Sequence, residues 1–351
     1  MSIRKFVNSG VIPACLICIA AVAIGQSVNA PKPPFTIKDA ERGLQFAKTS
    51  FEVRQQIGDF RGPAEPFKIA GNLYFVGVAN GESYLLTSPQ GHILFGAGFK
   101  NTAELVEKNI ETLGFKLRDI KVILLNHNHG DQSGAAAYFK EKTGAAVMAG
   151  FGEIPYLEKA IQPPPTTGTA PPAPDPKTIS PFGLFPSPQF FGIQDYPAVK
   201  VDRALYDGDV IKVGPLSVTA YLAPGHSPTA TSFLFTVRDG GREYRVFEWC
   251  CWEFPDDYSK NSNINEASVH HTFEMWGKVN PIDIYLETGS YAWSGILNQP
   301  SGTFQERLAK LKANPKLWIN REVFAGLAAA REVSFEDNMA KMKAKPSVAA
   351  K

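Results

Sequence analysis

Short apolar segments separated by turn residues dominate the first half of the sequence. Apolar, aromatic and β-branched residues fill Leu73–Val78, Ser83–Thr87 and His92–Phe95, which predicts three short strands. Turn residues occupy the gaps at 79–81 and 88–91. Because gaps this short suit hairpins, we expect these strands to be consecutive and antiparallel.

One amphipathic helix is predicted after these strands. Apolar residues recur at helical spacing from Val106 to Leu113, and Gly114 supplies a stop signal. Asn101, with Glu104 three residues later, predicts the cap at the start of this helix.

A strand, helix, strand crossover follows. Ile120–Leu125 is a nearly continuous apolar run, as expected of a strand covered on both faces, and it ends abruptly in the polar residues 126–133. Gly134–Glu141 predicts a short helix that Gly144 stops, and Ala145–Met148 predicts the next strand. The polar cluster therefore lies beyond the carboxyl end of a buried strand, where ligands gather in α/β sheets.

The second half of the chain repeats this mixture of strands and helices without repeating its sequence. Val269, Phe273 and Trp276 mark a helix, and 323–342 predicts a terminal helical region. Together the segments predict an α+β fold with two mixed sheets of similar size, each flanked by helices. The strands expected here are Val210–Val213, Leu216–Leu222, Ser232–Val237, Tyr244–Phe247 and Ile282–Leu286, with a hairpin turn at Asp239-Gly240-Gly241.

Two parts of the chain differ from this globular pattern. Residues 1–30 place Arg4 and Lys5 before an apolar stretch from Val11 to Ile24 and small residues ending at Ala30, which is typical of a secretory signal peptide. Residues from about 162 to 197 are crowded with proline and predict a surface insertion. We therefore predict a signal peptide at 1–30, a lead segment at 31–65 and one domain at 66–345 that carries the insertion.

Export to the periplasm or out of the cell follows from that signal peptide. Its apolar stretch is shorter than the roughly 20 residues of a spanning helix, and no comparable stretch follows in the sequence. No integral membrane span is therefore expected once the signal is removed. An uncleaved anchor stays an alternative, because Pro31 directly after Ala30 is a poor context for cleavage.

Composition narrows the possible partners. The chain of 351 residues has 36 Lys and Arg against 34 Asp and Glu, a formal charge of +2, which excludes electrostatic capture of nucleic acid as a default role. With 44% hydrophobic and 20% charged residues the composition is ordinary for a globular protein. A small-molecule substrate is the expected partner.

Histidine placement gives the strongest chemical signal. Of six histidines, His127 and His129 follow the buried strand 120–125, and His226 lies in the turn Pro224–Pro228 after another strand. Alternate residues of an extended loop point to the same side, so both imidazoles of the first pair can face one ion, and Asp131 can join it or face a neighbouring ion. These residues predict a metal site.

The sequence resembles the metallo-β-lactamase superfamily, specifically the third subclass of zinc β-lactamases. The resemblance extends from about Pro66 to the terminal helix, and it implies a four-layer αβ/βα sandwich with metal at one edge between two sheets. The segments that carry it are Gly71–Gly77, Thr87–His92, Leu124–Asp131, Val199–Arg203, Pro224–His226 and Asp239–Val246.

The resemblance assigns roles to the candidate ligands. It implies that His127, His129 and His226 bind the first zinc, and that Asp131 binds a second zinc and orients the attacking hydroxide. A zinc with three protein ligands keeps an open position whose water has a pKa near 7. The expected chemistry is attack of a metal-bound hydroxide on a carbonyl carbon.

The second zinc site departs from the family pattern at several positions. Gln132 stands where the motif His-x-His-x-Asp-His has its last histidine, and an amide is a poorer zinc ligand than imidazole. The segment Tyr285–Tyr291 contains no histidine, although the family has one after this strand, and Gly96 stands where the family usually has an aspartate. One zinc is therefore expected, with a second uncertain.

Cys251 is a tentative substitute ligand. It falls where relatives have serine, aspartate or, in other subclasses, a zinc-binding cysteine. Cys250 and Cys251 are alternatively small buried strand residues, and a disulfide between such neighbours needs a strained ring.

Several other residues have a structural and a functional interpretation. His270 and His271 lie on a predicted helix and are expected at the surface or in the core, because helical neighbours point about 100° apart and at most one could reach the site. His92 is expected to be structural. The aromatic residues near the predicted site either pack the core or line a pocket; they are Trp249, Trp252, Tyr291 and Trp293.

These observations predict an exported zinc-dependent hydrolase that opens a cyclic amide or ester, with β-lactam hydrolysis first among the reactions. Two alternatives stay open. One is a metallo-hydrolase of another substrate, such as a lactone or thioester, because fold does not choose the substrate. The other is a member of the fold that binds a metal or ligand without efficient catalysis.

Overall fold

The computed structural model describes residues 36, 38–43, 45, 62–79, 81–159, 197–227, 229–250, 265–287 and 303–344. The predicted signal peptide, the proline-rich insertion up to residue 196 and Cys251 lie outside these residues. The domain boundaries predicted at 30/31 and 65/66 therefore stay predictions.

The first sheet contains seven strands in the order β1-β2-β3-β4-β5-β6-β7, which is also their order in the chain. Strands β1 to β4 pair antiparallel, and β4 to β7 pair parallel, so the sheet is mixed as predicted. Its strands are β1 (Phe67–Ala70), β2 (Leu73–Phe75), β3 (Tyr84–Leu86), β4 (His92–Phe95), β5 (Ile120–Leu125), β6 (Ala146–Gly150) and β7 (Arg203–Leu205).

The second sheet contains five strands in the order β12-β11-β10-β9-β8. Strands β8 to β11 pair antiparallel, whereas β12 pairs parallel with β11. Its strands are β8 (Val210–Val213), β9 (Leu216–Leu222), β10 (Thr231–Asp239), β11 (Arg242–Trp249) and β12 (Ile284–Glu287).

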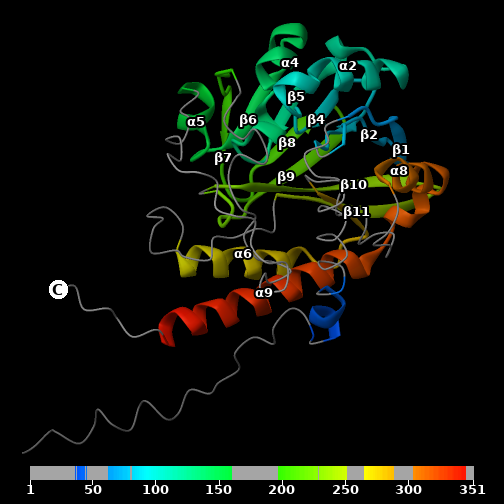
Figure 1. The fold of residues 1–351 in the computed structure, drawn as a ribbon. Helices are drawn as coiled ribbons and strands as arrows, with labels where there is room; N and C mark the ends of the chain where they lie inside the picture. Colours follow the sequence, from blue (N-terminus) through cyan, green and yellow to red (C-terminus); the bar gives the residue numbers. More distant parts are fainter. Residues whose placement is uncertain are drawn as a thin grey trace, which may run out of the picture. The chain divides into compact units, whose positions relative to one another are not determined.

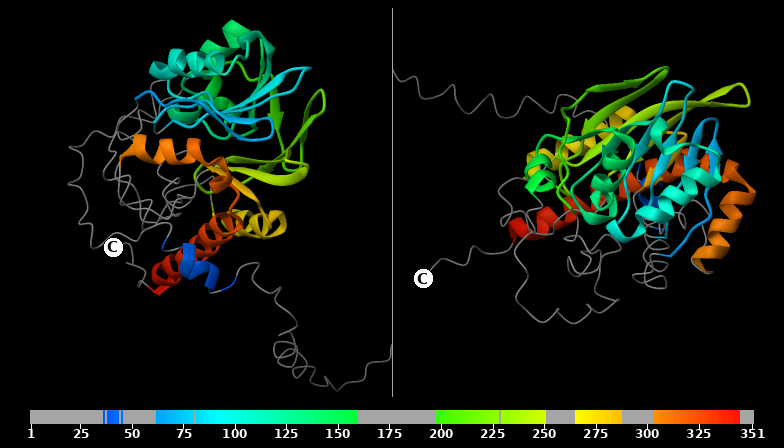
Figure 2. Two further views of the ribbon diagram at one scale, coloured as in Figure 1. Left: turned by 90° about the vertical axis from the view of Figure 1, so that its right-hand side faces the viewer. Right: turned by 90° about the horizontal axis from the view of Figure 1, so that it is seen from above.

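Helices cover the outer faces of both sheets, which gives the predicted four layers (Figures 1 and 2). The first sheet carries α2 (Ala103–Thr112), α3 (Gly130–Ser133), α4 (Ala136–Thr143) and α5 (Ile154–Lys159) on its side of the sandwich. Beneath the second sheet lie α6 (Glu266–Val279) and α9 (Arg321–Ala344), and α8 (Phe304–Ala313) packs beside β1. None of the helices in the described ranges combines the length and apolar character that a membrane crossing needs.

Strand β5 lies at the centre of this arrangement because both of its faces are apolar. Val122 and Leu124 belong to the core between the sheets, together with Phe233 of β10. Ile123 and Leu125 belong to the core beneath α2 and α4. The period-two alternation thus buries the strand on both sides and fixes where it ends.

The helix starts differ in how they are capped. The predicted cap at Asn101 is wrong: Lys100–Thr102 form a 3-10 turn, and α2 begins after Thr102 without a side-chain cap. The Thr102 hydroxyl instead donates a hydrogen bond to the carbonyl oxygen of Phe99, at 3.0 Å. By contrast, α8 begins with a complete capping box between Thr303 and Glu306.

The two sheets approach each other closely at the end of β6. A Cβ placed on Gly150 would lie 2.2 Å from the carbonyl oxygen of Thr229, in the segment that leads into β10. Real Cβ atoms do not come this close to a backbone oxygen, so the glycine is required for the approach. The contact matters because Thr229 follows the turn that carries His226.

We predict that Gly150→Ala lowers the free energy of unfolding by about 1–3 kcal/mol, because the added methyl overpacks a contact with backbone that cannot move alone. Denaturant unfolding measures the change. Gly81→Ala is the matched control, since its methyl would meet only side-chain atoms of Phe99 and Val78, at 3.0–3.1 Å. Equal losses in the two variants would contradict the prediction.

Candidate metal centre

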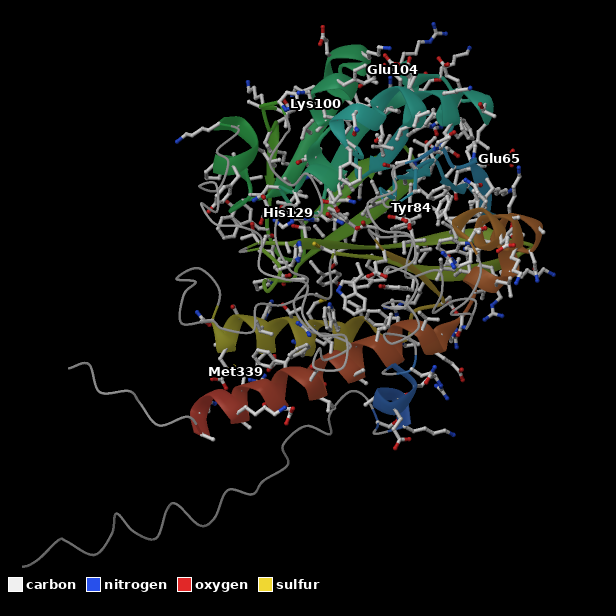
Figure 3. All side chains as sticks on the ribbon, in the orientation of Figure 1. Glu65, Tyr84, Lys100, Glu104, His129 and Met339 are labelled. Atoms are coloured by element: carbon white, nitrogen blue, oxygen red, sulfur yellow. The ribbon has the colours of Figure 1, made fainter. Side chains whose placement is uncertain are left out.

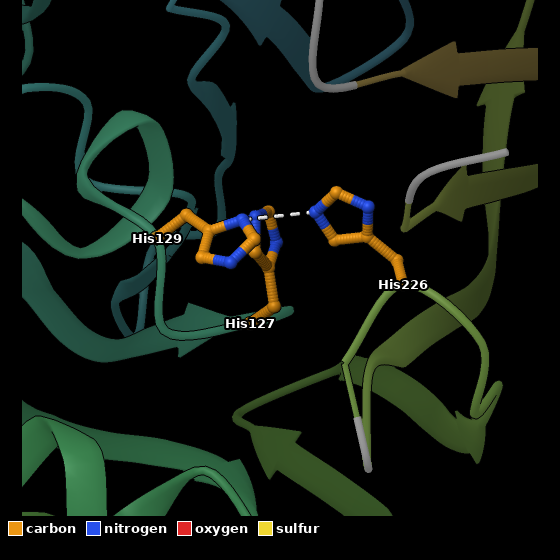
Figure 4. A group of neighbouring side chains, drawn as sticks. All are labelled: His127, His129 and His226. Atoms are coloured by element: carbon orange, nitrogen blue, oxygen red, sulfur yellow. Dashed lines mark hydrogen bonds between the residues drawn. The ribbon is translucent and has the colours of Figure 1, made fainter. Parts of the chain in front are cut away.

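Three histidine rings converge from two loops that belong to different sheets (Figure 4). His127 and His129 follow β5, and His226 lies in the turn after β9. The ring centroids are 4.5, 4.7 and 4.7 Å apart, close to an equilateral triangle. One nitrogen from each ring lies within 4.8 Å of the others. Figure 3 labels His129, which in this view lies between the sheets.

The loop after β5 is held in place by its own hydrogen bonds. The Ser133 hydroxyl donates to the carbonyl oxygens of Asn128 and His129, at 3.1 and 2.8 Å. The short helix α3 starts directly after His129, whose backbone is extended. The alternation expected of an extended loop thus applies to His127 and His129, whose rings face the same point.

The turn that carries His226 is anchored to the helix below it. Gly225 has φ 155°, a conformation that residues other than glycine rarely adopt, and its amide donates to the carbonyl oxygen of Ser227 at 3.2 Å. The Thr272 hydroxyl of α6 donates to the carbonyl oxygen of Pro224 at 2.9 Å. The turn therefore presents its imidazole from a fixed backbone.

Burial keeps His127 and His129 neutral. It lowers the pKa of His127 well below the usual value, and the neighbouring rings of His129 and His226 lower it further. Burial and the His226 ring likewise hold the pKa of His129 well below its usual range. Neutral imidazole is the form that binds a metal ion, so the cluster is prepared for a cation at neutral pH.

A buried hydrogen-bond chain fixes the tautomer of His127. Asn126 Nδ2 donates to Glu248 Oε1 at 2.9 Å, so its other amide atom, Oδ1, faces His127 Nδ1 at 2.7 Å. Since that oxygen can only accept, the proton of His127 is on Nδ1, and Nε2 keeps its lone pair for a metal. Cys250 Sγ lies 3.5 Å from the same Nδ1 atom.

Asp131 lies beside the histidine cluster. Its Oδ1 atom is 3.6 Å from His127 Nε2, and 13% of its side chain is exposed. The carboxylate is thus next to the nitrogen that the Asn126 contact leaves available, and it is accessible to water.

The position of Gln132 explains how two departures from the family pattern fit together. Gln132 is buried, and among the described residues its amide has no hydrogen-bond partner. A Cβ on Gly96 would lie 2.4 Å from Gln132 Oε1. An aspartate at 96 and the observed glutamine side chain at 132 would therefore compete for the same space.

A second metal site is incomplete among the residues that the structure describes. There, His127, His129 and His226 form the one group of three ligating side chains whose ligand atoms lie this close together. Cys251, and the residues after Glu287 that would complete the late loop, lie outside these residues. The role predicted for Cys251 stays a prediction.

The other candidates have structural surroundings. His92 packs edge-on against Phe115, and its Nδ1 accepts from the Ser88 amide at 3.4 Å. His270 lies near Glu336, with His270 Nε2 3.4 Å from the carboxylate oxygen, while His271 is exposed. Trp249 is fully buried against Trp276, so it packs the core; Trp252, Tyr291 and Trp293 lie outside the described residues.

Sequence reasoning missed three buried residues that support the cluster. Asn126 and Glu248 orient His127, and Glu153 accepts hydrogen bonds from both histidine loops. The only available signal was the adjacency of Asn126 to the first histidine. Glu153 and Glu248 are single acidic residues in a turn and a strand, and nothing in their spacing points to the site.

Fold and cluster together define a metal-dependent hydrolase of the αβ/βα sandwich class. A family profile described as the metallo-beta-lactamase superfamily matches residues 76–239. The chain has the metallo-β-lactamase fold, and its structure resembles those of subclass B3 enzymes.

Solved structures of similar proteins agree with this assignment. BJP-1, a subclass B3 metallo-β-lactamase of Bradyrhizobium japonicum, is 28% identical with a TM-score of 0.60, over 83% of this chain and 99% of that one. GOB-18, a metallo-β-lactamase from Elizabethkingia meningoseptica, is 25% identical with a TM-score of 0.63, over 80% and 94%.

A third similar structure bears on Gln132. It is a metallo-β-lactamase from Cronobacter sakazakii described by its HARLDQ motif, 26% identical with a TM-score of 0.64 over 82% of this chain and 92% of that one. Residues 127–132 of this chain read HNHGDQ, with the same aspartate and glutamine at the end. Glutamine at this position is thus shared with at least one β-lactamase of the fold.

We predict that Glu248→Gln changes how stability depends on pH. Burial raises the pKa of Glu248 to about 8, against 4.5 for an ordinary glutamate. Between these values the unfolded chain loses the proton and the folded chain keeps it, so this group's stabilisation is complete below pH 4.5 and is lost as pH rises through about 8.

Glutamine mimics the protonated acid and still accepts from Asn126 Nδ2. The free energy of unfolding of the variant, relative to that of the wild type, should therefore be larger at pH 9 than at pH 5. Denaturant unfolding of both metal-free proteins at the two pH values measures this difference. A difference that stays constant with pH would contradict the assignment.

Proposed function

We propose that the chain is a zinc-dependent hydrolase that opens a cyclic amide or ester, with a β-lactam as its first substrate class. The convergence of three imidazoles at one point carries this proposal, and the pKa values of His127 and His129 are lowered well below the usual value. Similarity to three β-lactamases supports the choice of substrate class. A lactone or thioester is the second candidate, because Gln132 stands where the zinc-binding motif of the family has a histidine.

Zinc fits the residues at this site. Two nitrogens on a tetrahedral zinc lie about 3.3 Å apart, and His226 Nε2 and His129 Nδ1 are 2.9 Å apart. Imidazole suits zinc better than it suits magnesium or calcium. When bound, zinc would supply a Lewis acid that polarises a carbonyl and acidifies water.

The protein's own groups would then divide the remaining work. His127, His129 and His226 hold the ion, and the Asn126 contact keeps the lone pair of His127 on Nε2. Asp131 Oδ1, 3.6 Å from that nitrogen, accepts a hydrogen bond from water and receives its proton. The carboxylate thereby orients the water towards the substrate carbonyl.

One zinc per chain is the proposed content. An amide is a weak zinc ligand, and Gln132 lies against Gly96. Asp131 and Cys251 are the proposed ligands of a second ion, if one binds. Export rests on the N-terminal pattern of charged, apolar and small residues.

We predict that His226→Ala removes zinc and activity together, because it leaves the ion only two of the three imidazole ligands. Elemental analysis of the purified mature protein, with a turnover assay on β-lactams, lactones and thioesters, measures both. His271→Ala is the control, since that ring is exposed and does not belong to the histidine cluster. Wild-type rates in His226→Ala would refute the metal assignment.

The wild-type protein in the same assay distinguishes the candidate functions. Turnover of a β-lactam supports the first substrate class, and turnover confined to lactones or thioesters supports the second. Zinc bound at one equivalent with the whole panel untouched would overturn the proposed hydrolase in favour of a binding role.

Cys251→Ser tests the second ion. A thiolate ligand should cost zinc content when it is replaced, whereas a packing residue should cost only a modest loss of stability. If the wild type holds more than one equivalent of zinc at saturation, we expect Cys251→Ser to hold less zinc than the wild type. Equal content in both proteins removes Cys251 from the ligand set.

A further inference from the structure

We propose that Glu153 is a positioning residue that joins the two histidine loops and holds the three imidazoles in register before the metal binds. The proposal rests on the proposed zinc site. It assigns Glu153 no contact with substrate or metal.

The Glu153 side chain is completely buried, and five hydrogen bonds surround its carboxylate. Oε2 accepts from the Asn128 backbone amide at 3.1 Å and from Asn128 Nδ2 at 2.8 Å. Oε1 accepts from the Ser227 hydroxyl at 2.7 Å, and from the Thr229 amide and hydroxyl at 3.1 Å each.

The donors divide between the two loops. Asn128 lies between His127 and His129, and Ser227 directly follows His226. One oxygen of the carboxylate therefore fixes the loop of the first sheet, and the other fixes the turn of the second. A shift of either loop would break these hydrogen bonds, of which those from Ser227 and Thr229 are buried.

Glu153 itself comes from a rigid turn. Its backbone amide donates to the carbonyl oxygen of Gly150 at 2.9 Å, and its own carbonyl accepts from Tyr156 and Leu157 at the start of α5. The neighbouring amide of Gly152 donates to the Thr229 hydroxyl at 2.9 Å. The side chain thus reaches the two loops from a third, independently fixed segment.

The chemistry of the contact requires a carboxylate. All five partners donate, and a carboxylate accepts through both oxygens. A glutamine of the same shape would turn its NH₂ group towards the backbone amide of Asn128 or of Thr229. Neither amide can accept, so one loop would lose that hydrogen bond.

A second link between the sheets makes the proposal specific to the histidines. The Thr231 amide donates to the carbonyl oxygen of Asn126 at 2.7 Å, and this bond joins the two sheets without Glu153. Loss of Glu153 should therefore loosen the loops while the sandwich stays assembled. This separates positioning of the site from general support of the fold.

Glu153→Gln tests the proposal in the full-length mature protein. We expect zinc affinity, measured by competition with a chromophoric chelator, to fall about 10–100-fold, as for other residues that orient metal ligands. Glu158→Gln is the matched control, because Glu158 accepts one backbone hydrogen bond, from Val201 at 3.1 Å, and none from the histidine loops. It should bind zinc like wild type.

Denaturant unfolding of the metal-free proteins supplies the second readout. If Glu153→Gln loses stability yet binds zinc like wild type, Glu153 has only a structural role, and that result overturns the proposal. Wild-type protein that binds no zinc overturns the proposed function as well, so the two failures are distinguishable.

Two further variants cover the case in which Glu153→Gln does not fold. Asn128→Ala and Ser227→Ala each remove one side-chain donor and keep the backbone amides. Both should weaken zinc binding, and combining Ser227→Ala with Glu153→Asp should weaken it less than the sum of the separate effects, since the residues share one network. Wild-type zinc affinity in both single variants would overturn the proposal.

Discussion

The site depends on one constraint: three imidazoles must be aimed at a common point although they come from two sheets. Burial of His127 and the neighbouring rings hold the pKa values of His127 and His129 well below the usual value. The same burial makes each misplaced polar atom around them costly, because water cannot replace a lost partner. The supporting hydrogen bonds of Asn126 and Glu153 are therefore as much a part of the site as the rings.

The sandwich meets this constraint by ending its strands at one edge. Strand β5 is apolar on both faces, so its register is fixed between the inter-sheet core and the helices α2 and α4. His127 therefore starts from a well-determined position one residue past Asn126. The second sheet comes close enough to meet it because Gly150 allows the backbone of Thr229 to approach. The packing of β5 and the close contact at Gly150 thus determine where the histidines lie at the edge of the sandwich.

The sequence predicted the two sheets and the three histidines that converge, but not the residues that orient them. Strand β5, the His-x-His pair and the Pro-Gly-His turn are local patterns, so periodicity and spacing reveal them. Glu153 acts on partners 25 and 74 residues away, and no local pattern records such a contact. The cap predicted at Asn101 is wrong for a different, local reason. The Thr102 hydroxyl bonds to the carbonyl oxygen of Phe99 in a 3-10 turn, an alternative that the same residue types allow.

The unusual residues near the second metal position are best understood as a pair. Within the described part of the chain no group pairs with the buried Gln132 amide, and burying such a group costs on the order of 1–3 kcal/mol. Its Oε1 atom lies where a side chain at position 96 would stand. Replacing either residue by the family's usual histidine or aspartate therefore changes the space available to the other. The HARLDQ motif of the Cronobacter β-lactamase ends in the same two residues. The hydrogen bonds by which Asn126, Glu153 and Glu248 support the histidine cluster do not involve Gln132 or Gly96, so a change in this pair leaves them in place.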